Sequence, residues 1–325
     1  MQTTRSSTTS LIALVTMAGS LSVAAWQASP ARSPGAAEFD GWMTQLSNWG
    51  RWGATDELGT VNLITPAVRR AAAALVTEGY SVSLARRLND VAAVDNPAPF
   101  LDKVPAGPPD GQFNTDDFAL PVHGFGFTHM DALSHVTYRG RMYNGAPGPS
   151  TVVAGRRRLS VEAFGNGIVS RGVIVDIPWL RGLPYLEPGA VIMPAELDAW
   201  EKKTGVTIGS GDVVFVRTGR WAVRDTRGPW DIGAKAAGVD ASAAGWFKRR
   251  DIAIFGSDGA GDVIPTTVTG VDFPLHPRVR GSMGTPRRDL CDLEAVAKAA
   301  IARRRWTFLV TLAPLRAGSA TGSPV

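Results

Sequence analysis

The stretch GFGFTHMDALSHV, residues 124–136, places His129, Asp131 and His135 within seven positions of a 325-residue chain that has only four histidines. Burying three ionisable groups without a partner or an ion would cost several kcal/mol. A metal site or a catalytic site accounts for the cluster. The structural alternative is a buried histidine satisfied within the core, with Asp131 capping the turn that follows.

The residues just before the cluster favour an extended strand. Side chains at alternate positions of a strand point to the same face. In a strand over residues 122–131, that face would carry His123, Phe125, Phe127, His129 and Asp131. Groups two positions apart on a strand lie about 7 Å apart at their bases and can converge on one cation. His135 would return to the same point through a turn or the start of a helix.

Two further candidate ligands lie far along the chain. His276 stands in DFPLHPRV and Asp289 in RRDLCDLEAV. A fold that brings them beside the first cluster would complete a shell of imidazole and carboxylate groups, which suits Zn²⁺ or Mn²⁺. Because Cys291 is the only cysteine, a structural zinc site of several thiolates is excluded, and so is an intramolecular disulfide.

The rest of the chain has the pattern of one mixed α/β domain. With 44% hydrophobic residues it can bury a core, and no internal repeat or Gly/Ser linker divides it after residue 40. Proline near the start and glycine at the end predict helices over 65–79 and 194–205. β-rich runs predict strands at 172–177, 212–219, 251–258 and 306–315. Several strands follow turns instead of helices, so we expect no regular doubly wound sheet, and the glycine signatures of nucleotide-binding loops are absent.

The N-terminal segment has the features of an export signal. Arg5 precedes the apolar run LIALVTMAGSLSVAA, which ends in small residues at Ala25. We therefore expect a signal peptide over 1–25, a flexible leader over 26–40 and the folded domain over 41–325, in a secreted or periplasmic protein. A membrane-anchoring helix is the alternative, and the run is short for one.

The net charge of +5 does not indicate a nucleic-acid partner. The basic residues form four scattered clusters, at 156–158, 248–250, 287–288 and 303–305, whereas nucleic-acid binding calls for one basic face with aromatic residues. Several clusters fall where helices are expected to end, and the helix dipole favours positive charges at that end. We expect them to be solvated.

These residues resemble the putative cyclase family, which includes bacterial kynurenine formamidases and isatin hydrolases. Its hallmark is H-x-G-T-H-x-D-x-P-x-H, and Thr128, His129, Asp131 and His135 keep its spacing. Further matches to the family's longer members are NWGRWGATDELGTVNLIT, GRMYNG, GSDGAGDVIP, PLHP and the closing APLR and TGSPV. The resemblance implies a single-domain swivelling β/β/α-type fold, in which helices flank a mixed sheet or barrel. It also implies a homo-oligomer.

The implied activity is that of a metal-dependent hydrolase. It would cleave an amide, a cyclic amide or a lactone of a small aromatic or cyclic substrate through metal-activated water. The resemblance makes His129, Asp131, His276 and Asp289 the ligands and His135 the base. Phe125 and Phe127 would form an apolar wall for the substrate, and the GSDGAGD segment would be a structural turn near the site.

The chain also departs from the hallmark. Phe125, Phe127 and Leu133 replace its first histidine, its glycine and its proline, and Asp289 replaces a glutamate. One ion is therefore expected in preference to two, and His123 is a candidate to replace the missing histidine. Three alternatives stay open: a serine hydrolase, which lacks a G-x-S-x-G motif here, a secreted binding protein that has lost catalysis, and a cyclase or dehydratase.

Overall fold

The computed structural model describes residues 33–103, 107, 111–113, 115–148, 152–153 and 156–325. The expected signal peptide and the first part of the leader lie outside these residues. The later part of the expected leader is not flexible, because helix α1 (Ala36–Gln45) begins within it. Phe39 of α1 is fully buried against Ala241 and Val268. The folded domain therefore begins before residue 41, and residues 34–325 form one compact unit.

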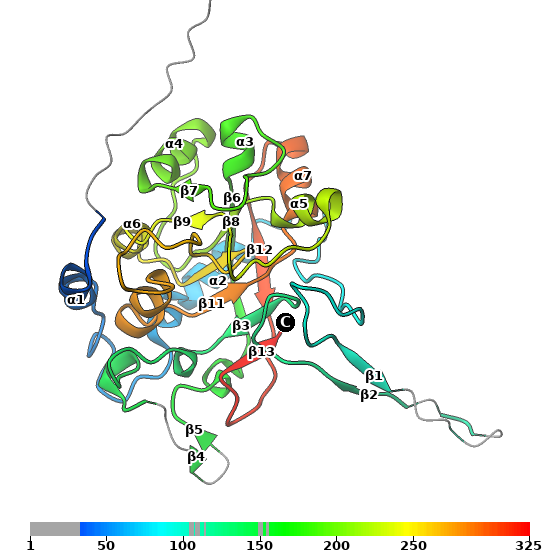
Figure 1. Cartoon of the computed structure of the whole chain (residues 1–325), viewed down its shortest axis with the longest axis horizontal. Helices are drawn as coiled ribbons and strands as arrows, with labels where there is room; N and C mark the ends of the chain where they lie inside the picture. The colour runs from blue at the N-terminus through cyan, green and yellow to red at the C-terminus, as the bar shows by residue number, and fades with distance from the viewer. Residues whose placement is uncertain (1–32, 104–106, 108–110, 114, 149–151, 154–155) are drawn as a thin grey trace, which may run out of the picture. The chain divides into compact units, whose positions relative to one another are not determined.

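A mixed seven-stranded sheet forms the centre of this unit (Figure 1), in the order β12-β6-β8-β10-β11-β3-β13. The strands are β3 (His129–Asp131), β6 (Ile168–Asp176), β8 (Val213–Arg217), β10 (Ile254–Ser257), β11 (Arg287–Asp289), β12 (Thr307–Leu312) and β13 (Gly322–Pro324). Strands β6, β8, β10 and β11 are parallel to one another. Strand β12 is antiparallel to β6, and β3 is antiparallel to β11 and β13. The expected mixed α/β fold is confirmed.

Helices flank the sheet: α2 (Pro66–Ala73), α3 (Ile177–Arg181), α4 (Pro194–Thr204), α5 (Arg220–Arg227), α6 (Ala243–Arg250) and α7 (Glu294–Arg303). Short helical turns are η1 (Gly59–Leu63), η2 (Leu133–His135), η3 (Tyr143–Gly145), η4 (Val161–Phe164) and the π-helical turn η5 (Pro277–Ser282). Two-stranded pairs are β1 (Leu101–Lys103) with β2 (Asp117–Ala119), β4 (Val152–Val153) with β5 (Arg156–Arg157), and β7 (Val191–Ile192) with β9 (Gly238–Val239). Within the described part of the chain, the helices are too short or too polar to cross a membrane.

Both predicted helices are present. The Thr65 hydroxyl accepts the Val68 N–H at 3.3 Å and Pro66 opens α2, as expected, although α2 ends at Ala73 and not near residue 79. Helix α4 ends at Gly205, whose φ of 72° is one that glycine adopts without strain. The four predicted strands correspond to β6, β8, β10 and β12.

One of the four basic clusters is not solvated. Arg287 and Arg288 lie in β11 inside the sheet, and their exposed fractions are 0% and 4%. Arg287 is paired with buried carboxylates, which offset the cost of burying its charge. The clusters at 248–250 and 303–305 lie at the ends of α6 and α7, as predicted.

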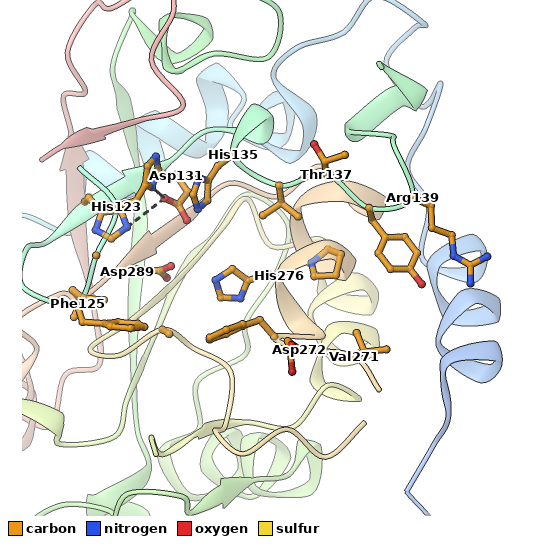
Figure 2. Close-up of a pocket in the computed structure, with 18 of the residues that line it drawn as sticks. His123, Phe125, Asp131, His135, Thr137, Arg139, Val271, Asp272, His276 and Asp289 are labelled. Atoms are coloured by element: carbon orange, nitrogen blue, oxygen red, sulfur yellow. Dashed lines mark ion pairs between the residues drawn. The ribbon is translucent and has the colours of Figure 1, made fainter. Parts of the chain in front are cut away.

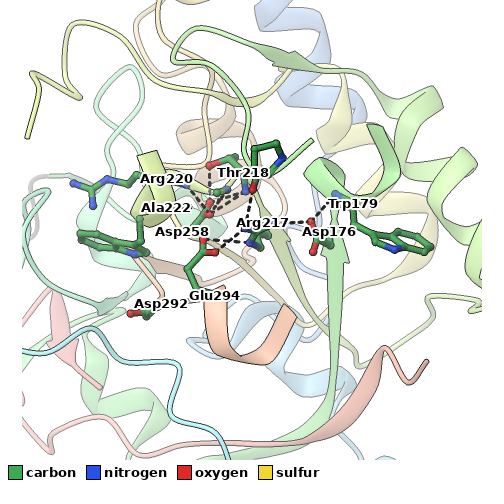
Figure 3. A network of polar contacts seen from close by, with 12 residues as sticks. Asp176, Trp179, Arg217, Thr218, Arg220, Ala222, Asp258, Asp292 and Glu294 are labelled. Carbon is green, nitrogen blue, oxygen red and sulfur yellow. Dashed lines mark hydrogen bonds and ion pairs between the residues drawn. The ribbon is translucent and has the colours of Figure 1, made fainter. Parts of the chain in front are cut away.

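A polar network joins the carboxyl ends of three parallel strands (Figure 3). Arg217, at the end of β8, pairs with Asp176 at the end of β6 at 2.9 Å and with Glu294 of α7 at 2.6 Å. Asp258 follows β10 and accepts hydrogen bonds from Thr218 and from the backbone N–H groups of Gly219 and Arg220. These contacts fix the position of α5 relative to the sheet.

Candidate metal centre

The segment before His129 is a bent loop, so the prediction of a strand over 122–131 is wrong for most of its length. Only His129–Asp131 form a strand, β3, which pairs with β11 on one side and β13 on the other. The loop nevertheless brings His123 back to the cluster. Its imidazole stacks on that of His135, with ring centroids 3.7 Å apart and planes 10° apart.

Three side chains converge on one point. His123 Nδ1 lies 2.9 Å from Asp131 Oδ1, and His129 Nε2 lies 3.3 Å from the same oxygen. One ligand atom from each of the three residues lies within 4.8 Å of the others. His129 and Asp131 are buried, and His123 is half-buried. Two ligand nitrogens and one oxygen at this spacing suit a divalent transition metal.

The hydrogen bond of His129 supports a cation at this point. Its Nδ1 lies 2.9 Å from the Phe127 carbonyl oxygen, which can only accept, so Nδ1 carries the proton and Nε2 carries a lone pair. Burial lowers the pKa of His129 and keeps the ring neutral. The lone pair of Nε2 therefore faces the Asp131 carboxylate. Both groups are hydrogen-bond acceptors, and a positive ion between them would stabilise this arrangement. His123 Nδ1 and Asp131 Oδ1 lie 2.9 Å apart but are not aligned for a hydrogen bond, and neither atom has another hydrogen-bond partner among the described residues.

Pairing of distant strands brings Asp289 to the same site. Asp289 of β11 lies opposite His129 of β3 in the antiparallel register. Its Oδ1 accepts from Arg287 Nη2 at 2.8 Å. Burial raises the pKa of Asp289, but Arg287 and the neighbouring charged groups outweigh burial, so the pKa is lowered and the carboxyl is ionised. The other oxygen of Asp131 pairs with the buried Arg280.

His276 lines the same cavity as these groups and contacts Asp262 and Arg287, and its expected role as a metal ligand stays a prediction. Its Nδ1 lies 2.5 Å from Asp262 Oδ2 and 2.7 Å from Arg287 Nη1. Asp262 also accepts the Leu275 backbone N–H at 2.6 Å, so the GSDGAGD segment is a structural turn next to the site. The compact group of three ligands found among the described residues includes neither His276 nor Asp289. In the tautomer whose Nδ1 donates to Asp262, the carboxylate orients the imidazole and Nε2 keeps a lone pair, which is the arrangement of a general base.

The four histidines and two of the carboxylates face one cavity of about 640 Å³ (Figure 2). Its lining includes His123, Phe125, His129, Asp131, His135, His276 and Asp289. Phe125 thus lies where a substrate would bind. Phe127 is not part of the lining and is only 2% exposed, because the bend turns its ring into the core.

His123 and His135 are neutral in this environment. Burial, followed by the neighbouring His129, lowers the pKa of His123 to about 4. Burial, followed by His123 and His276, lowers the pKa of His135 to about 3. Both rings therefore have a lone pair at neutral pH, which a ligand or a proton acceptor requires.

The sequence pattern did not identify three polar residues of the site. Arg280 and Arg287 lie close in sequence to His276 and Asp289, but isolated arginines give no pattern that predicts burial. Thr321, whose hydroxyl lies 2.8 Å from His123 Nε2, belongs to the closing TGSPV. Only the pairing of β13 with β3 shows that the end of the chain reaches the site.

A cavity in which imidazoles and carboxylates converge beside a mixed sheet is the arrangement of an enzyme active site. Residues 48–261 match the model of the family described as putative cyclase, which is more than half of the chain. The chain belongs to the putative cyclase family. A comparison with curated proteins gives no match.

Solved structures share the fold. The crystal structure of a novel cyclase is 27% identical, with a TM-score of 0.77, and the match covers 87% of this chain and 96% of that one. Isatin hydrolase A from Ralstonia solanacearum is 20% identical, with a TM-score of 0.51, over 80% of this chain and 95% of that one. Isatin hydrolase A from Labrenzia aggregata, bound to benzyl benzoate, is 18% identical, with a TM-score of 0.51, over 75% and 90%.

Proposed function

We propose that this enzyme is a metal-dependent hydrolase that cleaves an amide, a cyclic amide or a lactone of a small aromatic or cyclic substrate. The observation that carries the proposal is the lone pair of His129 Nε2 facing the Asp131 carboxylate at 3.3 Å. The isatin hydrolases of the same fold support the reaction type.

His123, His129 and Asp131 would hold one divalent cation, Zn²⁺ or Mn²⁺, with Asp289 beside them. Such an ion polarises a carbonyl group and acidifies a water molecule. The surrounding charges favour a single ion. Three buried carboxylates, Asp131, Asp262 and Asp289, are paired with the two guanidinium groups of Arg280 and Arg287. The excess of one negative charge balances half of the charge of one dication, whereas a second dication would leave a buried charge of +3.

Other residues of the chain would position the substrate and move protons. Phe125 lines the cavity and would contact an apolar ring. His135, stacked on His123, would accept a proton and return it to the leaving nitrogen or oxygen. His276, held by Asp262, is a second group suited to this task.

Replacing His135 with glutamine is expected to lower kcat about 100-fold or more, because a glutamine side chain cannot accept the proton. The metal content should stay near normal, since His135 is outside the three-residue ligand group. Steady-state kinetics and elemental analysis of the same preparation check both expectations. Unchanged turnover would exclude His135 as the base.

The proposal is tested with the purified protein and a panel of anilides, N-formyl aromatics, cyclic imides and lactones. We expect about one equivalent of a transition metal, product release from at least one member of the panel, and loss of activity on chelation that the metal reverses. Full activity in metal-free protein, together with inhibition by a serine-directed reagent, would instead establish a serine hydrolase.

A binding protein without catalysis is the second candidate, and Phe125 at the place of the hallmark's first histidine favours it. Such a protein would show a higher melting temperature with panel compounds and release no product. A cyclase or dehydratase would be recognised by its products.

We further propose that residues 1–25 are removed on export and that the enzyme acts outside the cell or in the periplasm as a homo-oligomer. The apolar run before Ala25 supports export. The intact mass of the mature protein would then correspond to a chain that begins at Trp26.

A further inference from the structure

Strained backbone in this protein is concentrated at the cavity. Seven described residues other than glycine have a left-handed backbone: Arg139, Asn144, Leu159, Asp251, Phe273, Leu290 and Arg304. Four of these are ordinary: asparagine tolerates this conformation, Asp251 and Arg304 end α6 and α7 as helix caps, and Arg139 lies with Gly140 in a two-residue hairpin turn that requires a positive φ. Of the remaining three, Phe273 and Leu290 line the cavity. Strain that gathers at a cavity indicates a functional constraint.

Phe273 is the less expected of the two. Its φ is +47°, which is an outlier for a bulky aromatic residue. Pro274 follows it, and a proline drives the preceding residue towards an extended conformation. A phenylalanine side chain has no polar group with which it could offset this strain by a local hydrogen bond.

The residues that follow hold Phe273 in place. Its carbonyl oxygen accepts the His276 backbone N–H at 3.0 Å. Asp262 accepts the Leu275 N–H and also binds the His276 imidazole. The Phe273 ring lies 5.4 Å from the His276 ring, at an angle of 66°. The contacts that orient His276 therefore also fix the Phe273 ring, which is only partly buried and faces the cavity.

We propose that Phe273 is a specificity-determining residue that contacts the substrate and selects flat aromatic rings over saturated ones. The strained backbone holds its ring as a rigid wall beside His276, in the same cavity as His123, His129 and Asp131. This inference rests on the proposed function and narrows its substrate class to compounds with an aromatic ring next to the scissile bond.

Two hydroxamic acids test the proposal by calorimetry on the metal-loaded protein. Benzohydroxamic acid and cyclohexanecarbohydroxamic acid share one metal-chelating head and differ in a flat or a puckered ring. We expect the aromatic compound to bind about fivefold more tightly, the range of one aromatic contact. The ratio should fall towards one in Phe273→Gly and in Phe273→Leu, which keeps the bulk of the side chain but has no aromatic face.

Thermal stability separates this role from packing. Glycine adopts a positive φ without strain, so Phe273→Gly should melt at or above the temperature of the parent protein. Arg304→Gly is the matched control, because Arg304 has a φ of +50° at the exposed end of α7, away from the cavity. It should raise the melting temperature slightly and leave the ratio of affinities unchanged.

Different failures are distinguishable. Equal binding of the two compounds to the parent protein, or an unchanged ratio in both Phe273 variants, would overturn the inference alone. A large fall in melting temperature or a failure to fold in Phe273→Gly, with an unchanged ratio in Phe273→Leu, would show that the ring serves packing. If neither hydroxamate binds, the metal-hydrolase proposal itself fails.

Discussion

Replacing His129 with alanine is expected to remove the bound metal and to lower turnover about a thousandfold or more. Loss of a Lewis acid removes several kcal/mol of transition-state stabilisation, and each 1.4 kcal/mol is a factor of about ten. His129 is the proposed ligand whose tautomer is fixed, since its Nδ1 donates to the Phe127 carbonyl and Nε2 faces Asp131. Elemental analysis after gel filtration gives the metal content, and kcat is measured in the same sample.

Three variants serve as comparisons for His129→Ala. His135→Gln, which also changes a cavity histidine, should keep its metal. His276→Ala and Asp289→Ala distinguish two ligand sets, because both residues were expected to bind the ion and neither belongs to the compact group of three. Full metal content in His129→Ala, with loss of metal in His276→Ala, would place the ion beside Asp262 instead.

The elements of the fold could be predicted from the sequence, but their arrangement could not. Pro66 and Pro194 mark the starts of α2 and α4, and the apolar runs mark buried strands, because these signals act within a few residues. The order of the strands depends on contacts between distant segments. No local pattern indicates that β3 lies between β11 and β13.

The same distinction holds at the site. His129 and Asp131 could be identified as candidate ligands because alternate residues of one short strand share a face. His123 lies next to the other two residues, as suggested, but not because of alternation along a strand. A bend in the loop before β3 brings its side chain to the group. Alternation along a strand also suggested that Phe127 faces the substrate. Because the segment bends, its ring lies in the core instead. The buried Arg280 and Arg287 could not be predicted, because their burial depends on carboxylates supplied by other strands.

Replacing Asp258 with alanine is expected to lower the free energy of unfolding by about 3–5 kcal/mol. The carboxylate is fully buried and accepts the N–H groups of Thr218, Gly219 and Arg220 and the hydroxyl of Thr218, at 2.7 to 3.2 Å (Figure 3). Burial raises the pKa of Asp258, and these hydrogen bonds only partly offset that effect. Alanine removes the buried charge, but it leaves four buried donors without a partner, which costs more.

Urea unfolding followed by fluorescence measures the change, and Glu187→Ala is the control. Glu187 is a carboxylate that pairs with Arg227 at 2.7 Å, and both side chains are largely exposed. Its replacement should therefore change the free energy of unfolding little. Asp258→Asn should be intermediate, because one carboxylate oxygen becomes an NH₂ group that faces N–H donors. Equal stability of Asp258→Ala and Glu187→Ala would show that the network does not hold the strand ends together.

The effect of Asp258 should also reach the cavity. Asp258 holds the backbone of Arg220, whose guanidinium group donates to the Phe125 carbonyl oxygen at 2.9 Å and pairs with Asp95 at 3.1 Å. Arg224 pairs with the same Asp95, but within the described part of the chain it makes no hydrogen bond to Phe125. Asp258→Asn should therefore lower both the affinity for benzohydroxamic acid and the stability of the fold. Arg220→Met should lower both quantities more strongly than Arg224→Met. Equal effects of the two arginine variants would confine the role of Arg220 to its ion pair.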